Sequence, residues 1–229
     1  MHLELVCSGR QTGCIEDREI PMNEAGNQCT SNINTPEYWD QVYSEEWQRG
    51  DVTSEDYNRD YGPIHDAIIA LIPDGSSVLD IACGPGILCR KIKLRLPNTK
   101  VMGVDFSQYT IERNTEFDQP LNIEYVCLDI SSSLSSIKRE FDVITMCEIL
   151  EHLNEPERVV ADAMNLLRKG GRFILTCPHD GEIPDPEHVR QWGHDELFHL
   201  LQGYSDTISF MHFPPPYFHI WVLAYLTKS

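Results

Sequence analysis

Short apolar runs alternate with amphipathic segments along most of the chain, from residue 76 onward. Such runs are typical of buried strands, and we predict strands at residues 77–81, 100–104, 122–127, 141–146 and 172–177. In the stretch PERVVADAMNLLRKGG the apolar residues instead form one stripe at helical spacing, so we expect a helix that ends at Gly170 and Gly171. Strands that alternate with helices predict an α/β fold with a doubly wound, mostly parallel sheet.

The C-terminal residues carry a different pattern. Two β-rich runs, DTISFMHF and YFHIWVLAYL, are separated by a short segment with prolines at positions 214 to 216. Two strands joined by so few residues form a hairpin, and they run antiparallel to each other. We therefore expect a seven-stranded sheet whose last strand is antiparallel.

The N-terminal part of the chain divides into two segments. Residues 1–34 mix polar residues with scattered charges and show no sustained period, which predicts a loosely ordered extension. The pattern becomes helical in TPEYWDQVYSEEWQ, where Thr35 can cap a helix and aromatic residues recur at helical spacing. We expect the helices of residues 35–75 to form a lid over residues 76–229, the core domain. Alternatively, these aromatic residues only pack on the core.

Composition narrows the class of protein. The 229 residues are 41% hydrophobic, enough for one domain with a sizeable core. The net charge of −18 repels polyanions, so we expect a small-molecule partner and consider nucleic acid unlikely. Eight cysteines without a C-x-x-C pair are typical of a reducing compartment, and no run of the sequence predicts a signal peptide or a membrane span. We expect a cytoplasmic protein without a membrane partner, either a monomer or a homodimer.

A turn rich in small residues follows the first predicted strand, in VLDIACGPG. It places Gly84 and Gly86 where a strand meets a helix, and glycines there let the backbone approach a ligand closely. A P-loop is excluded because the turn has no lysine or hydroxyl residue at the required place. A dinucleotide motif matches only in part, because Cys89 occupies the position of the third glycine. The turn alone therefore predicts a ligand site without identifying the ligand.

Three aspartates at successive strand ends bear on that question. Asp105 ends the second strand, where a carboxylate can accept hydrogen bonds from both ribose hydroxyls of an adenosine, and Asp129 follows the third, where it could accept from an adenine amino group. Asp80, directly before the glycines, would repel a pyrophosphate but suit a cationic sulfonium ligand. The three acids favour a cationic ligand. Alternatively, Asp105 and Asp129 cap helices or turns, and Asp80 holds the amides of the glycine turn.

Five segments in this order, VLDIACGPG, GVDFS, CLDI, FDVITMCEILEHL and LLRKGGRFILTCP, resemble the successive motifs of class I S-adenosylmethionine-dependent methyltransferases. The resemblance extends from residue 60 to residue 227. It implies the Rossmann-like methyltransferase fold and S-adenosyl-L-methionine as the cofactor. Ala82 departs from the family pattern, because it stands at the position of the first glycine. The residues that the resemblance implies at the cofactor are Asp80, Ala82, Gly84, Gly86, Asp105, Phe106, Asp129, Ile130, Cys147 and Glu148.

Methyl transfer from a sulfonium is an in-line displacement, so the protein mainly has to align the acceptor and exclude water. In CEILEHLNEP, a helical turn that starts at Glu148 would place Glu151 and His152 on one face. His152 is the candidate general base, and His188 in the loop after the fifth strand is the second candidate catalytic residue. Alternatively, His152 only fixes its loop through a backbone hydrogen bond. The same loop also carries His179, Arg190, Trp192 and His194.

Glu148, Glu151, His152 and His188 also resemble the metal-ligand set of small-RNA 3′-terminal 2′-O-methyltransferases, and such donors suit Mn²⁺ or Mg²⁺. The acidic balance argues against an RNA substrate, so we expect a mechanism without a metal. The predicted function is methyl transfer from S-adenosylmethionine to an oxygen or nitrogen of a small molecule of the natural-product, quinone or sugar type. Two alternatives stay open: the metal-dependent RNA methyltransferase, and a non-catalytic module that keeps the cofactor fold.

Overall fold

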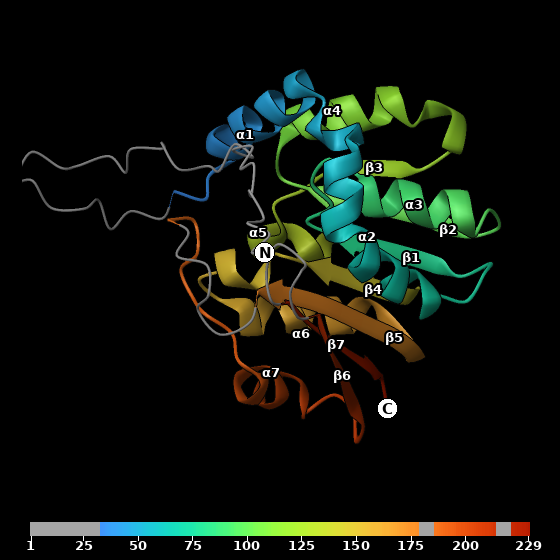
Figure 1. The fold of residues 1–229 in the computed structure, drawn as a ribbon. Helices are drawn as coiled ribbons and strands as arrows, with labels where there is room; N and C mark the ends of the chain where they lie inside the picture. The colour runs from blue at the N-terminus through green and yellow to red at the C-terminus, as the bar shows by residue number, and fades with distance from the viewer. Residues whose placement is uncertain (1–32, 179–185, 214–220) are drawn as a thin grey trace, which may run out of the picture. The chain divides into compact units, whose positions relative to one another are not determined.

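A single seven-stranded sheet forms the centre of the fold (Figure 1). The structure is a computed structural model that describes residues 33–178, 186–213 and 221–229. The strands are β1 (Ser77–Ile81), β2 (Lys100–Asp105), β3 (Glu124–Cys127), β4 (Phe141–Cys147), β5 (Leu167–Pro178), β6 (Ile208–Phe213) and β7 (Trp221–Thr227). They lie in the order β3-β2-β1-β4-β5-β7-β6. The first five pair in parallel, whereas β7 is antiparallel to both β5 and β6.

Seven α-helices are found within the described residues. They are α1 (Pro36–Arg49), α2 (Glu55–Ala70), α3 (Ile87–Arg95), α4 (Gln108–Phe117), α5 (Ile130–Ser133), α6 (Pro156–Leu166) and α7 (His194–Leu201). Short 3-10 turns are η1 (Asp51–Thr53), η2 (Gln119–Leu121), η3 (Leu134–Ser136) and η4 (Leu150–His152). None of the helices in this part of the chain is long and apolar enough to span a bilayer.

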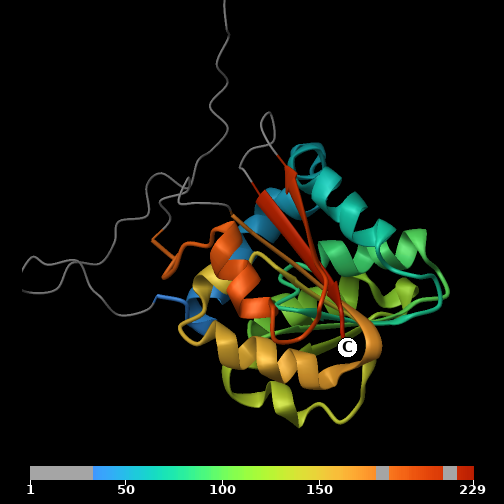
Figure 2. The same cartoon turned by 90° about the horizontal axis from the view of Figure 1, so that it is seen from below.

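Neighbouring residues of β1 show how the two faces of the sheet are covered. Val78 belongs to an apolar cluster that includes Ile68 of α2, whereas Leu79 belongs to a second cluster that includes Met164 of α6 and Leu197 of α7. Successive side chains of a strand point to opposite faces, so β1 is buried on both sides. Figures 1 and 2 show α2, α3 and α4 on one side of the sheet and α6 and α7 on the other. The predicted doubly wound sheet with an antiparallel last strand is confirmed.

The helix predicted in PERVVADAMNLLRKGG ends earlier than expected. The helix α6 stops at Leu166, and the chain passes directly into β5 at Leu167, which pairs with Phe141 of β4. Lys228 Nζ donates hydrogen bonds to the carbonyl oxygens of Met164 (2.8 Å) and Leu167 (2.7 Å), where the helix ends. Sheet pairing and this lysine end the helix, and the prediction that the two glycines do so was wrong.

Candidate active site

Three residues of the turn between β1 and α3 have left-handed backbone conformations. The φ angles of Ala82, Gly84 and Gly86 are 60°, 48° and 72°. A Cβ atom at Gly84 would lie 3.2 Å from Oη of Tyr43, and one at Gly86 would lie 2.5 Å from Oη of Tyr125. Both glycines are therefore required by backbone conformation and by close packing. Ala82 tolerates the same region at a cost of roughly 1–2 kcal/mol, a form of strain that clusters at binding sites.

Asp105, at the end of β2, fixes this turn from the neighbouring strand. Its Oδ2 accepts a hydrogen bond from the N–H of Gly84 (2.9 Å), and its Oδ1 accepts one from the N–H of Ser107 (3.0 Å). Burial raises the pKa of the Asp105 carboxyl to about 6, the backbone hydrogen bonds oppose this rise, and nearby Asp40 adds to it. Asp105 is thus a turn residue, as one interpretation of the sequence held, and it also lines the cavity described next.

A cavity of about 480 Å³ opens at the carboxyl ends of β1, β2, β3 and β4. Ligands of doubly wound sheets bind at this edge. Seven of the residues singled out in the sequence line the cavity: Ala82, Asp105, Phe106, Asp129, Ile130, Glu148 and His152. Asp129 also caps α5, because its Oδ1 accepts a hydrogen bond from the N–H of Ser131 (2.8 Å). The cavity therefore brings together the expected cofactor end and the candidate base.

Asp80 lies apart from this cavity, on the side of the sheet covered by α3. Its carboxylate is buried and accepts hydrogen bonds from Oγ1 of Thr145 (2.6 Å) and Sγ of Cys89 (3.2 Å). Burial raises its pKa to about 6, although these two hydrogen bonds lower it. In this structure Asp80 joins β1, β4 and α3, and its contact with the cofactor stays a prediction. Cys147 is also absent from the cavity lining, and burial raises the pKa of its thiol.

The first helix forms one wall of the cavity. As expected, Thr35 caps α1, since its Oγ1 accepts a hydrogen bond from the N–H of Tyr38 (3.3 Å). Asp40 accepts hydrogen bonds from the hydroxyl of Ser107 and from the N–H of Tyr109 (3.1 Å), so α1 is tied to the segment that follows β2. Trp39 lines the cavity, and its ring meets the His152 ring edge to face at 5.3 Å. These contacts support a covering role for α1, which stays a prediction.

The segment after β4 differs from the expected helical turn. Glu148 has a φ angle of 51°, and only Leu150–His152 forms a 3-10 turn. Glu148 Oε1 accepts a hydrogen bond from the hydroxyl of Thr176 (2.7 Å) on β5. The Glu148 side chain is therefore bound to β5, whereas the Glu151 side chain lies beside His152. The expectation that Glu148, Glu151 and His152 share one helical face was wrong, because the left-handed residue precedes the turn and the turn is not α-helical.

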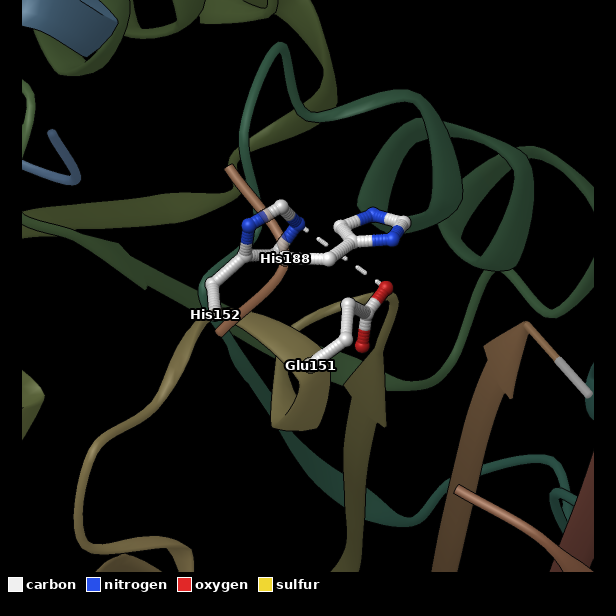
Figure 3. Close-up of side chains that lie close together, drawn as sticks. All are labelled: Glu151, His152 and His188. Carbon is white, nitrogen blue, oxygen red and sulfur yellow. Dashed lines mark ion pairs between the residues drawn. The ribbon is translucent and has the colours of Figure 1, made fainter. Parts of the chain in front are cut away.

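Glu151, His152 and His188 nevertheless come together beside the cavity (Figure 3). Their potential ligand atoms all lie within 4.8 Å of one another. Nε2 of His152 lies 3.8 Å from Oε1 of Glu151, and the rings of His152 and His188 meet at 5.0 Å. The backbone positions His188, because the carbonyl oxygen of Glu151 accepts a hydrogen bond from the N–H of Val189 (2.8 Å). His179, in the same predicted loop, lies outside the described residues.

Sequence reasoning missed Asn34 and Glu187. Glu187 is buried, and its carbonyl oxygen accepts hydrogen bonds from Nδ2 of Asn34 (2.8 Å) and from Nδ1 of His152 (3.2 Å). Its carboxylate accepts a hydrogen bond from the hydroxyl of Tyr38. These partners are separated by up to 153 residues, so no local pattern could have revealed them. The alternative that His152 fixes its loop through a backbone contact is compatible with this geometry.

Comparison with known proteins gives a matching domain for part of the chain. Residues 79–175 match the model of the family described as a methyltransferase domain. A ubiquinone biosynthesis O-methyltransferase of Coxiella burnetii is 36% identical over 104 residues, which are 44% of this chain and 43% of that protein. The enzyme of the same name from Idiomarina loihiensis is 30% identical over 126 residues, or 52% of this chain and 51% of that protein. The chain thus matches about half the length of these curated relatives.

Solved structures show the same fold at low sequence identity. Magnesium protoporphyrin IX methyltransferase from Synechocystis, crystallised with S-adenosylhomocysteine, aligns with a TM-score of 0.68 at 17% identity, over 85% of this chain and 98% of that one. An N-methyltransferase from Bradyrhizobium japonicum aligns with a TM-score of 0.62 at 18% identity, over 76% and 98% of the two chains. The matched domain, the order of the strands and the glycine turn all indicate the same fold. Residues 79–175 thus match a methyltransferase domain, and the described residues have the Rossmann-like fold of the S-adenosylmethionine-dependent methyltransferases.

Proposed function

We propose that this protein transfers a methyl group from S-adenosylmethionine to a hydroxyl oxygen of a small phenol or quinol. The observation that carries the proposal is that one cavity has Ala82 and Asp105, from the expected cofactor site, in its lining together with His152 and Trp39. The names of the matched relatives, which are ubiquinone O-methyltransferases, support this acceptor class. When bound, the cofactor supplies a methyl group whose bond to sulfur breaks as a bond to the acceptor oxygen forms, with the electron pair left on sulfur and the hydroxyl proton released.

The residues at the glycine turn fit an adenosine ligand. The Asp105 carboxylate faces the cavity from the end of β2, where it can accept hydrogen bonds from ribose hydroxyls. Phe106 and Ile130 line the same region and offer apolar surface to a purine ring, and the exposed carboxylate of Asp129 can accept from an amino group. The lining thus contains the polar and apolar groups that an adenosine requires.

Apolar side chains line part of the cavity. Trp39, Ile149 and Leu153 line it together with His152, so a flat aromatic acceptor could be enclosed there and shielded from water. His152 and its neighbour His188 stay the candidate groups for activating the hydroxyl. The cavity size also argues for a small acceptor.

Labelled methyl transfer tests this proposal. The full chain would be incubated with S-adenosylmethionine labelled in the methyl group and with 3,4-dihydroxybenzoate, and in parallel with a fractionated cell extract. We expect label in the phenolic fraction. Label in RNA would favour the RNA methyltransferase, and cofactor binding without transfer to any fraction would favour a non-catalytic module. Either result would overturn the proposed reaction.

A further inference from the structure

The cluster of Glu151, His152 and His188 combines metal-ligand chemistry with burial. The carboxylate of Glu151 is only 2% exposed, and the two imidazoles beside it are half-buried. The three side chains come from the turn after β4 and from the segment before α7, and Figure 3 shows them converging. Burying a carboxylate is costly unless a positive charge accompanies it. A cation held by the three side chains would supply such a charge.

The environment of His152 favours a cation. Its Nδ1 lies 3.2 Å from the carbonyl oxygen of Glu187, and because a carbonyl can only accept, Nδ1 carries the hydrogen. In the neutral ring the lone pair is then on Nε2, which lies on the side of Glu151, 3.8 Å from Oε1 of that carboxylate. A backbone carbonyl that accepts from one ring nitrogen is the usual arrangement behind a metal-bound histidine. The carbonyl is itself fixed by Nδ2 of Asn34.

We propose that Glu151, His152 and His188 bind one divalent transition-metal cation of the Mn²⁺ or Zn²⁺ type. Two imidazole nitrogens and one carboxylate oxygen suit such ions, whereas Mg²⁺ prefers oxygen ligands. Ligand atoms on one such ion lie about 2.0–2.2 Å from it and so at most about 4.3 Å apart. The observed limit of 4.8 Å requires only small side-chain rotations. The proposal departs from the metal-free mechanism expected from the sequence.

The metal set also differs from the four residues that the sequence suggested. Among the described residues the close group is Glu151, His152 and His188, whereas Glu148 Oε1 accepts a hydrogen bond from Thr176. Three ligands would leave further coordination positions on such an ion for other groups. His152 lines the cavity, so an open position would be accessible to an acceptor hydroxyl. This step rests on the proposed function: the cation would lower the hydroxyl pKa, and the proton would leave to solvent. The oxygen would then form its bond to the methyl carbon as the bond from that carbon to sulfur breaks, with the electron pair left on sulfur.

Calorimetric titration with Mn²⁺ tests the site directly. The full chain would be treated with EDTA, freed of it, and titrated with Mn²⁺, with Zn²⁺ and Mg²⁺ in parallel. We expect one Mn²⁺ site, weaker by at least about tenfold in His188→Ala and in Glu151→Gln. His199→Ala is the matched control, since His199 is exposed on α7, and it should keep the wild-type affinity. Equal affinities in all four proteins would mean general binding to an acidic surface and would overturn the proposal.

Titration of the same proteins with S-adenosylmethionine separates the two proposals. Both variants should keep the wild-type cofactor affinity, which shows that they are folded. A wild type that binds Mn²⁺ but no cofactor would overturn the proposed function and leave the metal site standing. A wild type that binds the cofactor but no transition-metal ion would overturn the metal site and leave His152 as the candidate general base.

Discussion

At the scale of single residues, cofactor binding depends most on Asp105. Both of its carboxylate oxygens accept backbone hydrogen bonds, and burial raises its pKa to about 6. The titratable groups that face it come from three elements and a turn. They are Asp40 and Tyr43 of α1, Asp80 of β1, Cys127 of β3 and Cys83 of the glycine turn. Because most of these neighbours are acidic, nothing in this set favours the ionised form of Asp105.

The raised pKa predicts a pH-dependent cofactor affinity. A carboxylate accepts from both ribose hydroxyls, whereas the protonated group also carries a hydrogen, so affinity should be highest above pH 6 and fall below it. Titration calorimetry between pH 7.5 and pH 5 should show a decrease that approaches about tenfold per pH unit below the pKa. In Asp105→Asn this decrease in cofactor affinity at low pH should disappear. A wild-type profile as flat as that of the variant would contradict the assignment.

The glycine turn allows a prediction with an internal control. Gly86→Ala adds a Cβ atom 2.5 Å from Oη of Tyr125, which donates a hydrogen bond to Asp118 (2.7 Å). Gly75 has a similar φ angle of 84°, but no neighbour lies within 4 Å of its added Cβ. Both variants should lose about 1–2 kcal/mol from backbone strain. Gly86→Ala should lose a further 1–3 kcal/mol or so from overpacking.

Urea denaturation of the two glycine variants measures this difference. The free energy of unfolding should decrease more in Gly86→Ala than in Gly75→Ala. Equal losses would mean that Tyr125 moves aside without cost, and that the glycine is required only by its backbone conformation.

At the scale of elements, α1 connects the two ends of the cavity. Tyr43 packs over Gly84 of the glycine turn, Asp40 binds the segment after β2, and Trp39 packs on His152. Trp47, near the end of the helix, meets Phe117 of α4 at 5.3 Å. One helix therefore contacts both the expected cofactor end and the candidate catalytic residues.

Truncation tests the role of α1. Deleting residues 1–32 leaves Asn34 and the Thr35 cap in place and should preserve turnover. Deleting residues 1–50 removes the helix and should abolish turnover, because the acceptor would no longer be enclosed. Labelled methyl transfer measures the turnover of both truncated proteins. Trp39→Ala, which keeps the helix, should lower turnover while thermal unfolding changes little. Full activity of the longer truncation would contradict the covering role.

At the scale of the whole molecule, the sheet could be predicted because its central strands are buried on both faces and read as apolar runs. The positions of Asp105 and Asp129 followed from the same pattern, since the carboxyl ends of parallel strands meet at one edge. The orientation of Asp80 could not be predicted, because it depends on Thr145 and Cys89 across the sheet. The contacts of Glu187 join segments more than a hundred residues apart and have no local signal.

The net charge of −18 is also a property of the whole molecule. A protein this acidic attracts cations and repels nucleic acid, which supports a small-molecule acceptor and requires the matched control in any metal titration. Prediction from the sequence therefore reached the fold, and several of its candidate residues line one cavity. The remainder depends on tertiary contacts of α1, the turn after β4 and the segment before α7.

A calorimetric titration of the wild type and of Asp105→Ala with S-adenosylmethionine at pH 7.5 tests the central claim most directly. The cavity at the glycine turn should bind one molecule of cofactor per chain. Loss of the Asp105 carboxylate should weaken binding by about one to two decades, because charge-assisted hydrogen bonds of roughly 1.5–3 kcal/mol are removed. Asp195→Ala, at an exposed residue of α7, is the matched control and should bind as the wild type does. No binding by the wild type, or equal affinity of Asp105→Ala, would contradict the account.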